Sequence, residues 1–297
     1  MKDPRFHLVD SPYLVPFDKS FRVADAPTAP PKGEGGKKRK GANKDALKES
    51  IGKIADLQQA LYANDSHAVL LVFQAMDAAG KDGTVRAVMS GVNPAGCQVS
   101  SFKAPSAEEI DHDFLWRISR QLPERGRIGI FNRSHYEEVL VVRVHPEYLD
   151  GQRIPHAPEP EQLFEERYES IRDFEKHLAR NGTVILKFWL NVGKNEQRDR
   201  FIDRVDEPEA NWKFNPGDIA ERRLWDEYMD AYEHALNETS RPWAPWYAIP
   251  ADDKAYMRRV VADIFQRTLE KIDPKFPAVD EKTRAEMLAL REELAKS

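Results

Sequence analysis

Continuous apolar runs alternate with longer amphipathic stretches along most of this chain. The clearest run is HAVLLVFQA at residues 67–75. Its length, its β-branched residues and the glycine turn that follows predict a strand buried on both faces. Further strands are predicted at residues 97–102, 127–132, 183–190 and, from a weaker pattern, 246–251.

Between these runs, apolar residues recur at the spacing of amphipathic helices. Residues 45–62 place Leu47, Ile51, Ile54, Leu57 and Leu61 on one face. Other helices are predicted at residues 80–90, 106–121, 160–180, 216–238, 252–271 and 280–296, the last on the surface. Residues 139–144 fit a helix end or a strand, and a helix is favoured. The alternation predicts an α/β fold, a parallel five-stranded sheet with helices on both faces.

Two segments depart from this alternation. Residues 1–44 are rich in Pro, Gly and Lys, which predicts an extended or flexible arm before a single domain at residues 45–297. The basic run at 37–40 fits a solvated tail or a polyanion contact, and the tail is favoured. Residues 192–225 interleave basic and acidic residues and are predicted to form a mobile lid.

Composition narrows the classes of function. The formal net charge of the 297 residues is -5, so the overall basic field typical of nucleic-acid binding is absent. The one cysteine, Cys97, allows no intrachain disulfide, which fits a reducing cytoplasm. The N-terminal residues lack a signal peptide's apolar core, and no stretch approaches the roughly 18 apolar residues of a membrane span. We therefore expect a cytoplasmic protein with no membrane partner.

The first predicted strand leads into FQAMDAAGKDGT at residues 73–84, a variant of the phosphate-binding P-loop or Walker A pattern. Gly80 and Lys81 match the pattern, whereas Ala75 replaces its first glycine and Asp82 its hydroxyl residue. The loop lies between a predicted strand and a predicted helix, so backbone N–H groups at the start of the helix can bind an anion. The alternative interpretation is an ordinary strand–helix turn that happens to contain Gly-Lys. The predicted phosphate-binding residues are Ala78, Ala79, Gly80, Lys81, Asp82, Gly83 and Thr84.

The departures from the P-loop pattern suggest the chemistry. Ala75 carries a Cβ, so no positive φ is expected there. Thr84 lies two residues late and is not expected to reach a metal. Asp77 would repel a bound phosphate unless it holds Mg²⁺, or Mn²⁺ in its place, or accepts a proton from the attacking group. Both roles point to phosphoryl transfer.

The third predicted strand ends in GIFNRSHYEEV. Asn132 stands where a P-loop enzyme often carries a metal-binding acid. Arg133 could brace a transferring phosphoryl group, or pair with Glu137 as an ordinary surface arginine. Weaker candidates for nucleotide binding are Asn93, Lys103, Arg117, Asn132 and Glu137.

Several long motifs resemble the polyphosphate kinase 2 family over residues 50–270. They are QAMDAAGKDGTVRAVMSGVNPAGCQVSSFKAPS, HDFLWR, LPERGRIGIFNRSHYEEVLVVRVHP, NWKF and APWYAIPADDK. FNRSHYEEVL and HDFLWR resemble the class III branch, whose members phosphorylate AMP and ADP with polyphosphate. The resemblance implies a three-layer α/β/α P-loop kinase fold, similar to thymidylate kinase, with a helical lid.

The resemblance also implies roles for particular residues. Asp77, Lys81 and Arg133 match positions required for phosphoryl transfer, and the lid arginines Arg198, Arg200 and Arg204 match those that grip polyphosphate. Other branches carry an aspartate where this chain has Asn132, so Glu137 and Glu138 become candidate metal ligands besides Asp77. Homo-oligomers are common in the family.

Helical spacing divides the lid cations into two pairs. Lys194 and Arg198 share one face, Arg200 and Arg204 share another, and only one pair is expected to line a polyphosphate channel. A solvated helix with i,i+4 pairs is the alternative.

The combined prediction is Mg²⁺-dependent, reversible transfer of the terminal phosphoryl group between polyphosphate and nucleotides, from AMP to ADP and from ADP to ATP. Two rival hypotheses are an ATP-dependent nucleoside monophosphate kinase of thymidylate-kinase type and a nucleotide-binding protein without catalysis.

Overall fold

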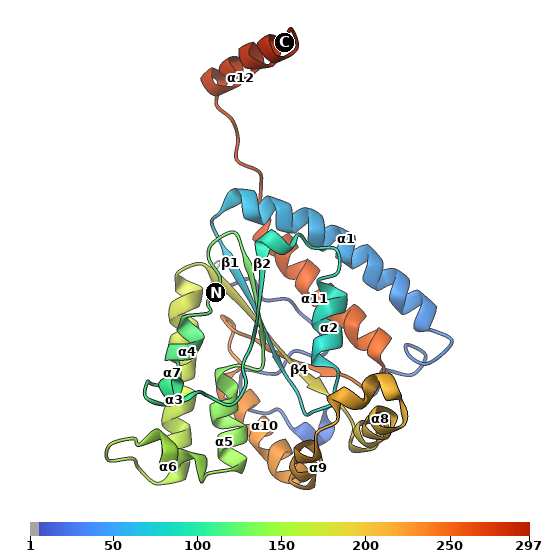
Figure 1. The fold of residues 1–297 in the computed structure, drawn as a ribbon, viewed down its shortest axis with the longest axis vertical. Helices are drawn as coiled ribbons and strands as arrows, with labels where there is room; N and C mark the ends of the chain where they lie inside the picture. The colour runs from blue at the N-terminus through green and yellow to red at the C-terminus, as the bar shows by residue number, and fades with distance from the viewer. Residues whose placement is uncertain (1–5) are drawn as a thin grey trace.

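The computed structural model describes residues 6–297, and its centre is a five-stranded parallel sheet in the order β2-β3-β1-β4-β5 (Figure 1). The strands are β1 Ala68–Gln74, β2 Cys97–Ser101, β3 Ile128–Asn132, β4 Thr183–Asn191 and β5 Trp246–Pro250. Every residue of β1 is buried, which explains its continuous apolar sequence. The predicted fold class is confirmed.

The strand order creates a binding crevice. From β1 the chain goes to β2 and β3 on one side of the sheet, and then to β4 and β5 on the other. Phe73 of β1 stands in register with Asn132 of β3 and with Phe188 of β4, so the carboxyl ends of the three strands meet at one edge. Ligands of open α/β sheets bind at such a reversal point.

Helices cover both faces of the sheet (Figure 1). On one face, α11 packs against both α1 and α2. On the other, α10 packs against α5 and α7, and α7 against β4. These helices are α1 Lys40–Asn64, α2 Lys81–Val88, α5 Val141–Val144, α7 Pro160–Arg180, α10 Trp225–Thr239 and α11 Lys254–Ile272.

Two predicted helices are interrupted. Residues 106–121 form two short helices, α3 Ala107–Ile110 and α4 Trp116–Ser119, because the carboxylate of Asp113 accepts a hydrogen bond from the Leu115 N–H between them. Residues 216–238 divide at Leu224 into α9 Pro216–Arg223 and α10. Residues 139–144, for which a helix was favoured over a strand, are helical. The 3₁₀ helix η3 His135–Val139 leads into α5 there.

The N-terminal segment, predicted to be an extended or flexible arm, packs against the domain along part of its length. Val9 and Val15 are fully buried. The Val15 N–H donates to the Trp246 carbonyl, and Leu14 forms an antiparallel bridge with Tyr247. The segment therefore covers the outer edge of β5, where open backbone groups need partners. Its basic run is exposed, and helix α1 already begins at Lys40.

The lid region contains α8 Lys194–Asp206, the 3₁₀ helix η4 Pro208–Lys213 and α9. At the end of the chain, helix α12 Glu281–Leu294 buries none of its residues and projects away from the body (Figure 1). This agrees with the predicted surface helix. Among residues 6–297, no helix combines the length and the apolar character needed to cross a membrane.

Candidate active site

The loop between β1 and α2 presents an uncapped helix start. Gly80, the residue before α2, has a φ of 106° and makes no side-chain capping bond. Ala78 also adopts a left-handed conformation, with a φ of 61°, whereas Ala75 does not, as predicted. Backbone N–H groups at such a helix start bind anions. The loop geometry therefore fits a phosphate group.

Lys81 closes the loop from within. Its Nζ donates to the carbonyl of Ala75, 2.7 Å away, so the side chain spans the loop from the helix start back to the strand end. Burial lowers the pKa of Lys81, and the nearby charge of Arg133 lowers it further. Its ammonium group is thus held inside the loop beside a second cation.

Arg133 lies opposite the loop, in a left-handed conformation with a φ of 61°. Its backbone N–H donates to the Phe73 carbonyl, which fixes the end of β3 against that of β1. The guanidinium donates to Asp77 over 2.8 Å and to Glu137 over 3.1 Å. Glu137 and then Asp77 raise the pKa of Arg133 against the effect of burial. The structure thus contains the Arg133–Glu137 pair that was considered as an alternative role for Arg133. The same guanidinium also contacts Asp77 of the loop.

Arg200 of the lid braces the loop. It is only 5% exposed. Its Nη1 donates to the carbonyls of Ala78 and Ala79, its Nη2 to those of Ala251 and Asp252, and its Nε to Glu196. These contacts use the guanidinium's donors, so Arg200 braces the loop in this structure, and its predicted contact with polyphosphate stays a prediction. A neighbouring lid residue that the sequence did not indicate, Gln197, donates to the Asp77 carbonyl over 2.9 Å.

We expect Arg200→Lys to lower kcat/KM by about tenfold or more, because small displacements at a reaction centre are costly. A lysine cannot reproduce the fork that joins the loop to residues 251 and 252. Steady-state kinetics on the purified variant measures the effect. Arg180→Lys is the matched control, since Arg180 is exposed at the end of α7, beside the amino end of β4 and away from the loop. Equal activity of the two variants would contradict the bracing role.

The other lid cations occupy different surroundings. Lys194 and Arg198 are exposed, while Arg204 pairs with Asp218 of α9 over 3.2 Å. Burial raises the pKa of Asp218, and the negative charge of Asp77 raises it further. Asp218 of the lid and Asp77 of the loop line the same cavity. No local motif marks Asp218 in the sequence.

Asp77, Arg133, Glu137 and Asp218 line one cavity of about 260 Å³, which we call the loop cavity. Within residues 6–297, no three His, Cys, Asp or Glu side chains form a ready-made metal cluster. Mg²⁺ is commonly held by one or two carboxylates together with phosphate oxygens and water, so this arrangement fits a metal bound with substrate.

A second, central cavity of about 490 Å³ adjoins the loop cavity. Both are lined by Arg133, Glu137 and Val141. Lys103 and Arg117 line the central cavity, and the Arg117 guanidinium donates to the Lys103 carbonyl over 2.9 Å. The structure thus brings these two weaker candidates to the edge of the site.

Other predicted residues lie elsewhere or are already bonded. Asn93 precedes β2 and caps the short 3₁₀ helix before it, so it lies at the amino end of the strand, away from the site. Glu138 accepts hydrogen bonds from Gln152 and Arg167 and does not line the loop cavity with Asp77, so it is not placed as a second metal ligand there. Asn132 donates to Asp82, so this pair ties the end of β3 to the start of α2.

The second half of the predicted phosphate-binding set also needs correction. Thr84 is fully buried, and both its N–H and its hydroxyl bond to the Gly80 carbonyl. It belongs to the helix interior and does not face a phosphate. Gly83 lies beneath Arg258, whose Nη2 would be 2.8 Å from a Cβ at this position, so glycine makes room for that side chain.

Comparison with known proteins identifies the family of the chain. The family model described as Polyphosphate kinase 2 (PPK2) matches residues 37–277. The chain belongs to the polyphosphate kinase 2 family. The chain is 55% identical to an ADP-polyphosphate phosphotransferase of Rhodopseudomonas palustris, covering 84% of this chain and 87% of that protein. It is 48% identical to an AMP/ADP-polyphosphate phosphotransferase of Meiothermus ruber, covering 82% and 86%.

A solved structure of the polyphosphate kinase 2 family has the same fold. The crystal structure of polyphosphate kinase 2 from Arthrobacter aurescens TC1 superposes with a TM-score of 0.83 at 40% identity, covering 92% of this chain and 93% of that one. The range matched by the family model contains the loop, Arg133 and the lid, and ends before α12.

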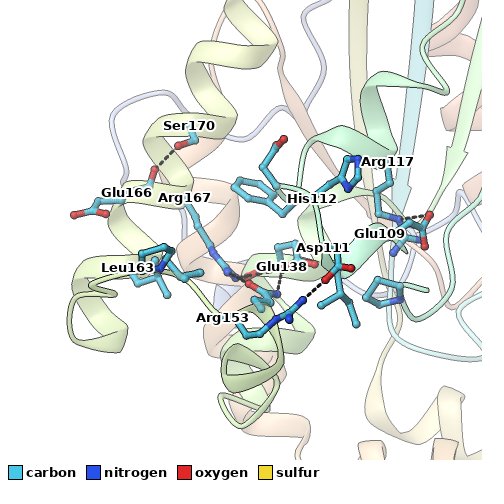
Figure 2. A pocket seen from close by; sticks show the side chains of 17 residues that line it. Glu109, Asp111, His112, Arg117, Glu138, Arg153, Leu163, Glu166, Arg167 and Ser170 are labelled. Carbon is cyan, nitrogen blue, oxygen red and sulfur yellow. Dashed lines mark hydrogen bonds and ion pairs between the residues drawn. The ribbon is translucent and has the colours of Figure 1, made fainter. Parts of the chain in front are cut away.

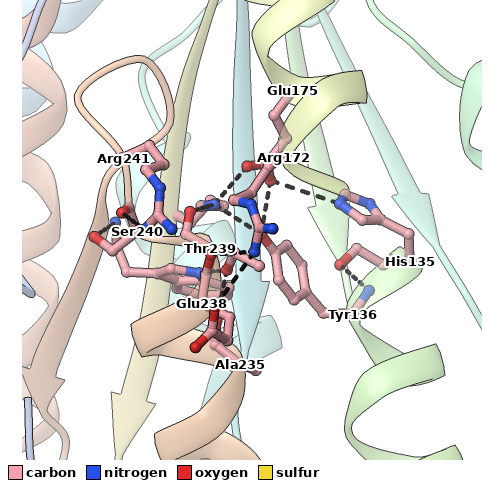
Figure 3. Close-up of polar contacts among 12 residues, drawn as sticks. His135, Tyr136, Arg172, Glu175, Ala235, Glu238, Thr239, Ser240 and Arg241 are labelled. Carbon is pink, nitrogen blue, oxygen red and sulfur yellow. Dashed lines mark hydrogen bonds and ion pairs between the residues drawn. The ribbon is translucent and has the colours of Figure 1, made fainter. Parts of the chain in front are cut away.

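A buried polar network supports the Arg133 side of this polyphosphate kinase 2 site. Lys187 of β4 is fully buried, and its Nζ donates to Glu175, to the Tyr136 hydroxyl and to the Thr239 carbonyl, over 2.7, 2.7 and 2.9 Å. The Tyr136 hydroxyl in turn donates to Glu175 over 2.8 Å. Burial lowers the pKa of Lys187 to about 8. Figure 3 shows Glu175 of α7 above Tyr136, three residues after Arg133.

Proposed function

We propose that this protein transfers the terminal phosphoryl group of inorganic polyphosphate to nucleotides, reversibly, from AMP to ADP and from ADP to ATP. The observation that carries the proposal is the position of Arg133. It joins Asp77 of the phosphate loop to Glu137, at the boundary of the loop cavity and the central cavity. The relative that is 55% identical is named an ADP-polyphosphate phosphotransferase, and the one that is 48% identical an AMP/ADP-polyphosphate phosphotransferase.

We infer that Mg²⁺, or Mn²⁺ in its place, is held by Asp77 with Asp218 or Glu137 as a second carboxylate. These residues line the same cavity, and burial, followed by the charge of Asp77, raises the pKa of Asp218. Two crowded carboxylates favour a cation between them. A bound Mg²⁺ would neutralise charge on the phosphate oxygens.

The residues present divide the reaction between them. The helix start at Gly80 and the Lys81 ammonium bind the terminal phosphate of the donor. Arg133 stabilises the negative charge that develops on the phosphoryl group. An acceptor phosphate oxygen, already ionised, forms the new P–O bond, while the old bond breaks and the electron pair stays on the shortened polyphosphate. Arg198 and Arg204 remain candidates for holding the polyphosphate chain, and lid contacts exclude water.

The donor assay tests this function. The purified protein is incubated with polyphosphate and AMP or ADP, without ATP, and the nucleotide products are separated by chromatography. We expect ADP and ATP to form. An ATP-dependent kinase would give product only when ATP replaces polyphosphate, and a binding protein would retain nucleotide without turnover. Either result would contradict the proposal.

Removal of the metal gives a second prediction. Treatment with a chelator is expected to reduce transfer to background, because Asp77 and the substrate phosphates then repel one another without a cation between them. Added Mg²⁺ or Mn²⁺ should restore transfer, and circular dichroism should show an unchanged fold throughout. Full activity after exhaustive chelation would contradict the metal role.

We also propose that the enzyme is a cytoplasmic homo-oligomer. The single cysteine fits a reducing compartment, and the family resemblance favours self-association. Light scattering after size-exclusion chromatography tests the second point, and cell fractionation tests the first.

A further inference from the structure

A third cavity, of about 440 Å³, adjoins the central cavity on the side away from the loop, and we call it the distal cavity (Figure 2). The distal and central cavities share a wall. Its residues are Pro105, Ile110, Phe114, Arg117, Glu138 and Gln152. None of the residues that line the loop cavity lines the distal one. The three cavities therefore form a series that starts at the phosphate loop.

The shared wall is held from behind by a buried arginine. Arg167 of α7 is 3% exposed, and its Nη1 donates to the carbonyl and the carboxylate of Glu138 over 2.8 and 3.3 Å. Its Nη2 donates to Gln152, and its guanidinium carbon lies 5.5 Å from the ring centre of Phe114. Figure 2 shows Arg167 reaching Glu138 from α7. A buried guanidinium bonded in this way fixes the positions of its partners.

The lining of the distal cavity suits a nucleobase. Phe114, Ile154 and Leu163 supply apolar surface. More of the lining residues are charged or polar, among them Asp113, Glu138, Glu166 and Arg167. An ion pair between Arg153 and Asp111 joins α6 Tyr148–Gln152 to the end of α3 beside it. Small-molecule sites combine apolar surface with polar groups that fix the orientation of the ligand, and this cavity offers both.

AMP and ADP differ in length, so their nucleosides need space at different distances from the loop. In both AMP and ADP, the terminal phosphate must reach the same point beside Asp77, Lys81 and Arg133. ADP has one more phosphate between that point and its ribose. Its nucleoside must therefore lie farther from the loop by about the length of one phosphate group.

We propose that the distal cavity receives the base of ADP, whereas the base of AMP stays in the central cavity, so that this cavity sets the choice between the two acceptors. The proposal rests on the proposed function. Filling the distal cavity should then impair ADP as an acceptor and spare AMP. Such a test leaves the residues of the phosphate loop unchanged.

Ser170→Trp tests the proposal, because Ser170 is exposed on α7 and lines the distal cavity but not the central one. We expect kcat/KM for ADP to fall by about tenfold or more while that for AMP changes by less than about twofold, in line with the discrimination that pocket size provides. Asp173→Trp, on the same helix and outside both cavities, is the control and should leave both values unchanged. Equal loss for AMP and ADP, or no loss for either, would overturn the proposal.

A second measurement keeps the test decisive if tryptophan prevents folding. Ser170→Leu fills less of the cavity and should change the products made from AMP and excess polyphosphate, so that ADP accumulates and ATP appears late. An unchanged ratio of ATP to ADP would overturn the proposal. Failure of the unaltered protein to use either acceptor would instead contradict the proposed function itself.

Discussion

Asp77→Asn is expected to abolish phosphoryl transfer, with kcat/KM for AMP and for ADP falling by at least about 10²-fold. The amide removes the charge that would hold Mg²⁺ beside the phosphates. The backbone contact from Gln197 to the Asp77 carbonyl does not depend on the side chain, and an amide oxygen can still accept from Arg133. The loop should therefore keep its conformation while losing its metal.

The matched control is Asp82→Asn in the same loop. Asp82 is exposed and its side chain accepts from Asn132, so its loss should lower activity only a few-fold. Thermal unfolding and circular dichroism establish that both variants are folded, and titration with Mg²⁺ measures metal dependence. Near-normal transfer by a folded Asp77→Asn protein would show that the metal is held elsewhere.

The largest loss of stability is expected from Lys187→Met, which should lower the free energy of unfolding by about 3–5 kcal/mol. Lys187 and Glu175 are fully buried or nearly so, and their atoms lie 2.7 Å apart. Removing the ammonium leaves the Glu175 carboxylate without its charged partner in the protein interior. The Thr239 carbonyl also loses a donor. Chemical denaturation followed by fluorescence measures the change.

A double variant separates the pair from its surroundings. Lys187→Met with Glu175→Leu removes both charges and should recover a large part of the lost stability, because apolar residues often replace a buried ion pair at little cost. A double variant as unstable as the sum of the two single variants would contradict the account. The same proteins test whether the network also supports Arg133, since a displaced Tyr136 would lower kcat in a folded protein.

Strand positions were predictable because burial on both faces leaves a continuous apolar sequence. Residues 67–75 and 183–190 lie in the middle of the sheet, and both runs match β1 and β4 closely. The prediction of one helix over residues 106–121 was wrong, because the Asp113 side chain accepts a hydrogen bond from the Leu115 N–H where the two short helices meet. The packing of the N-terminal segment was not predictable because its few apolar residues, such as Val9 and Val15, find partners only after the edge of β5 exists.

For the site, the sequence placed Asp77, Lys81 and Arg133 together, since each follows or ends a strand of one parallel sheet and the carboxyl ends of such strands share an edge. Asn93 was wrongly included because closeness in sequence to β2 did not reveal that it lies at the opposite end of that strand. Asp218 and Gln197 were missed because they reach the loop through the folding of the lid.

By itself, the sequence determined the α/β class, the central strands and the phosphate loop, because apolar periodicity and glycine turns act over a few neighbouring residues. The tertiary structure alone decided that Arg200 braces the loop, that Asp218 and Asp77 line the same cavity and that Arg167 holds the wall between two others. These contacts join residues far apart in the chain. Their partners depend on how whole helices pack, and no local pattern of side chains records that packing.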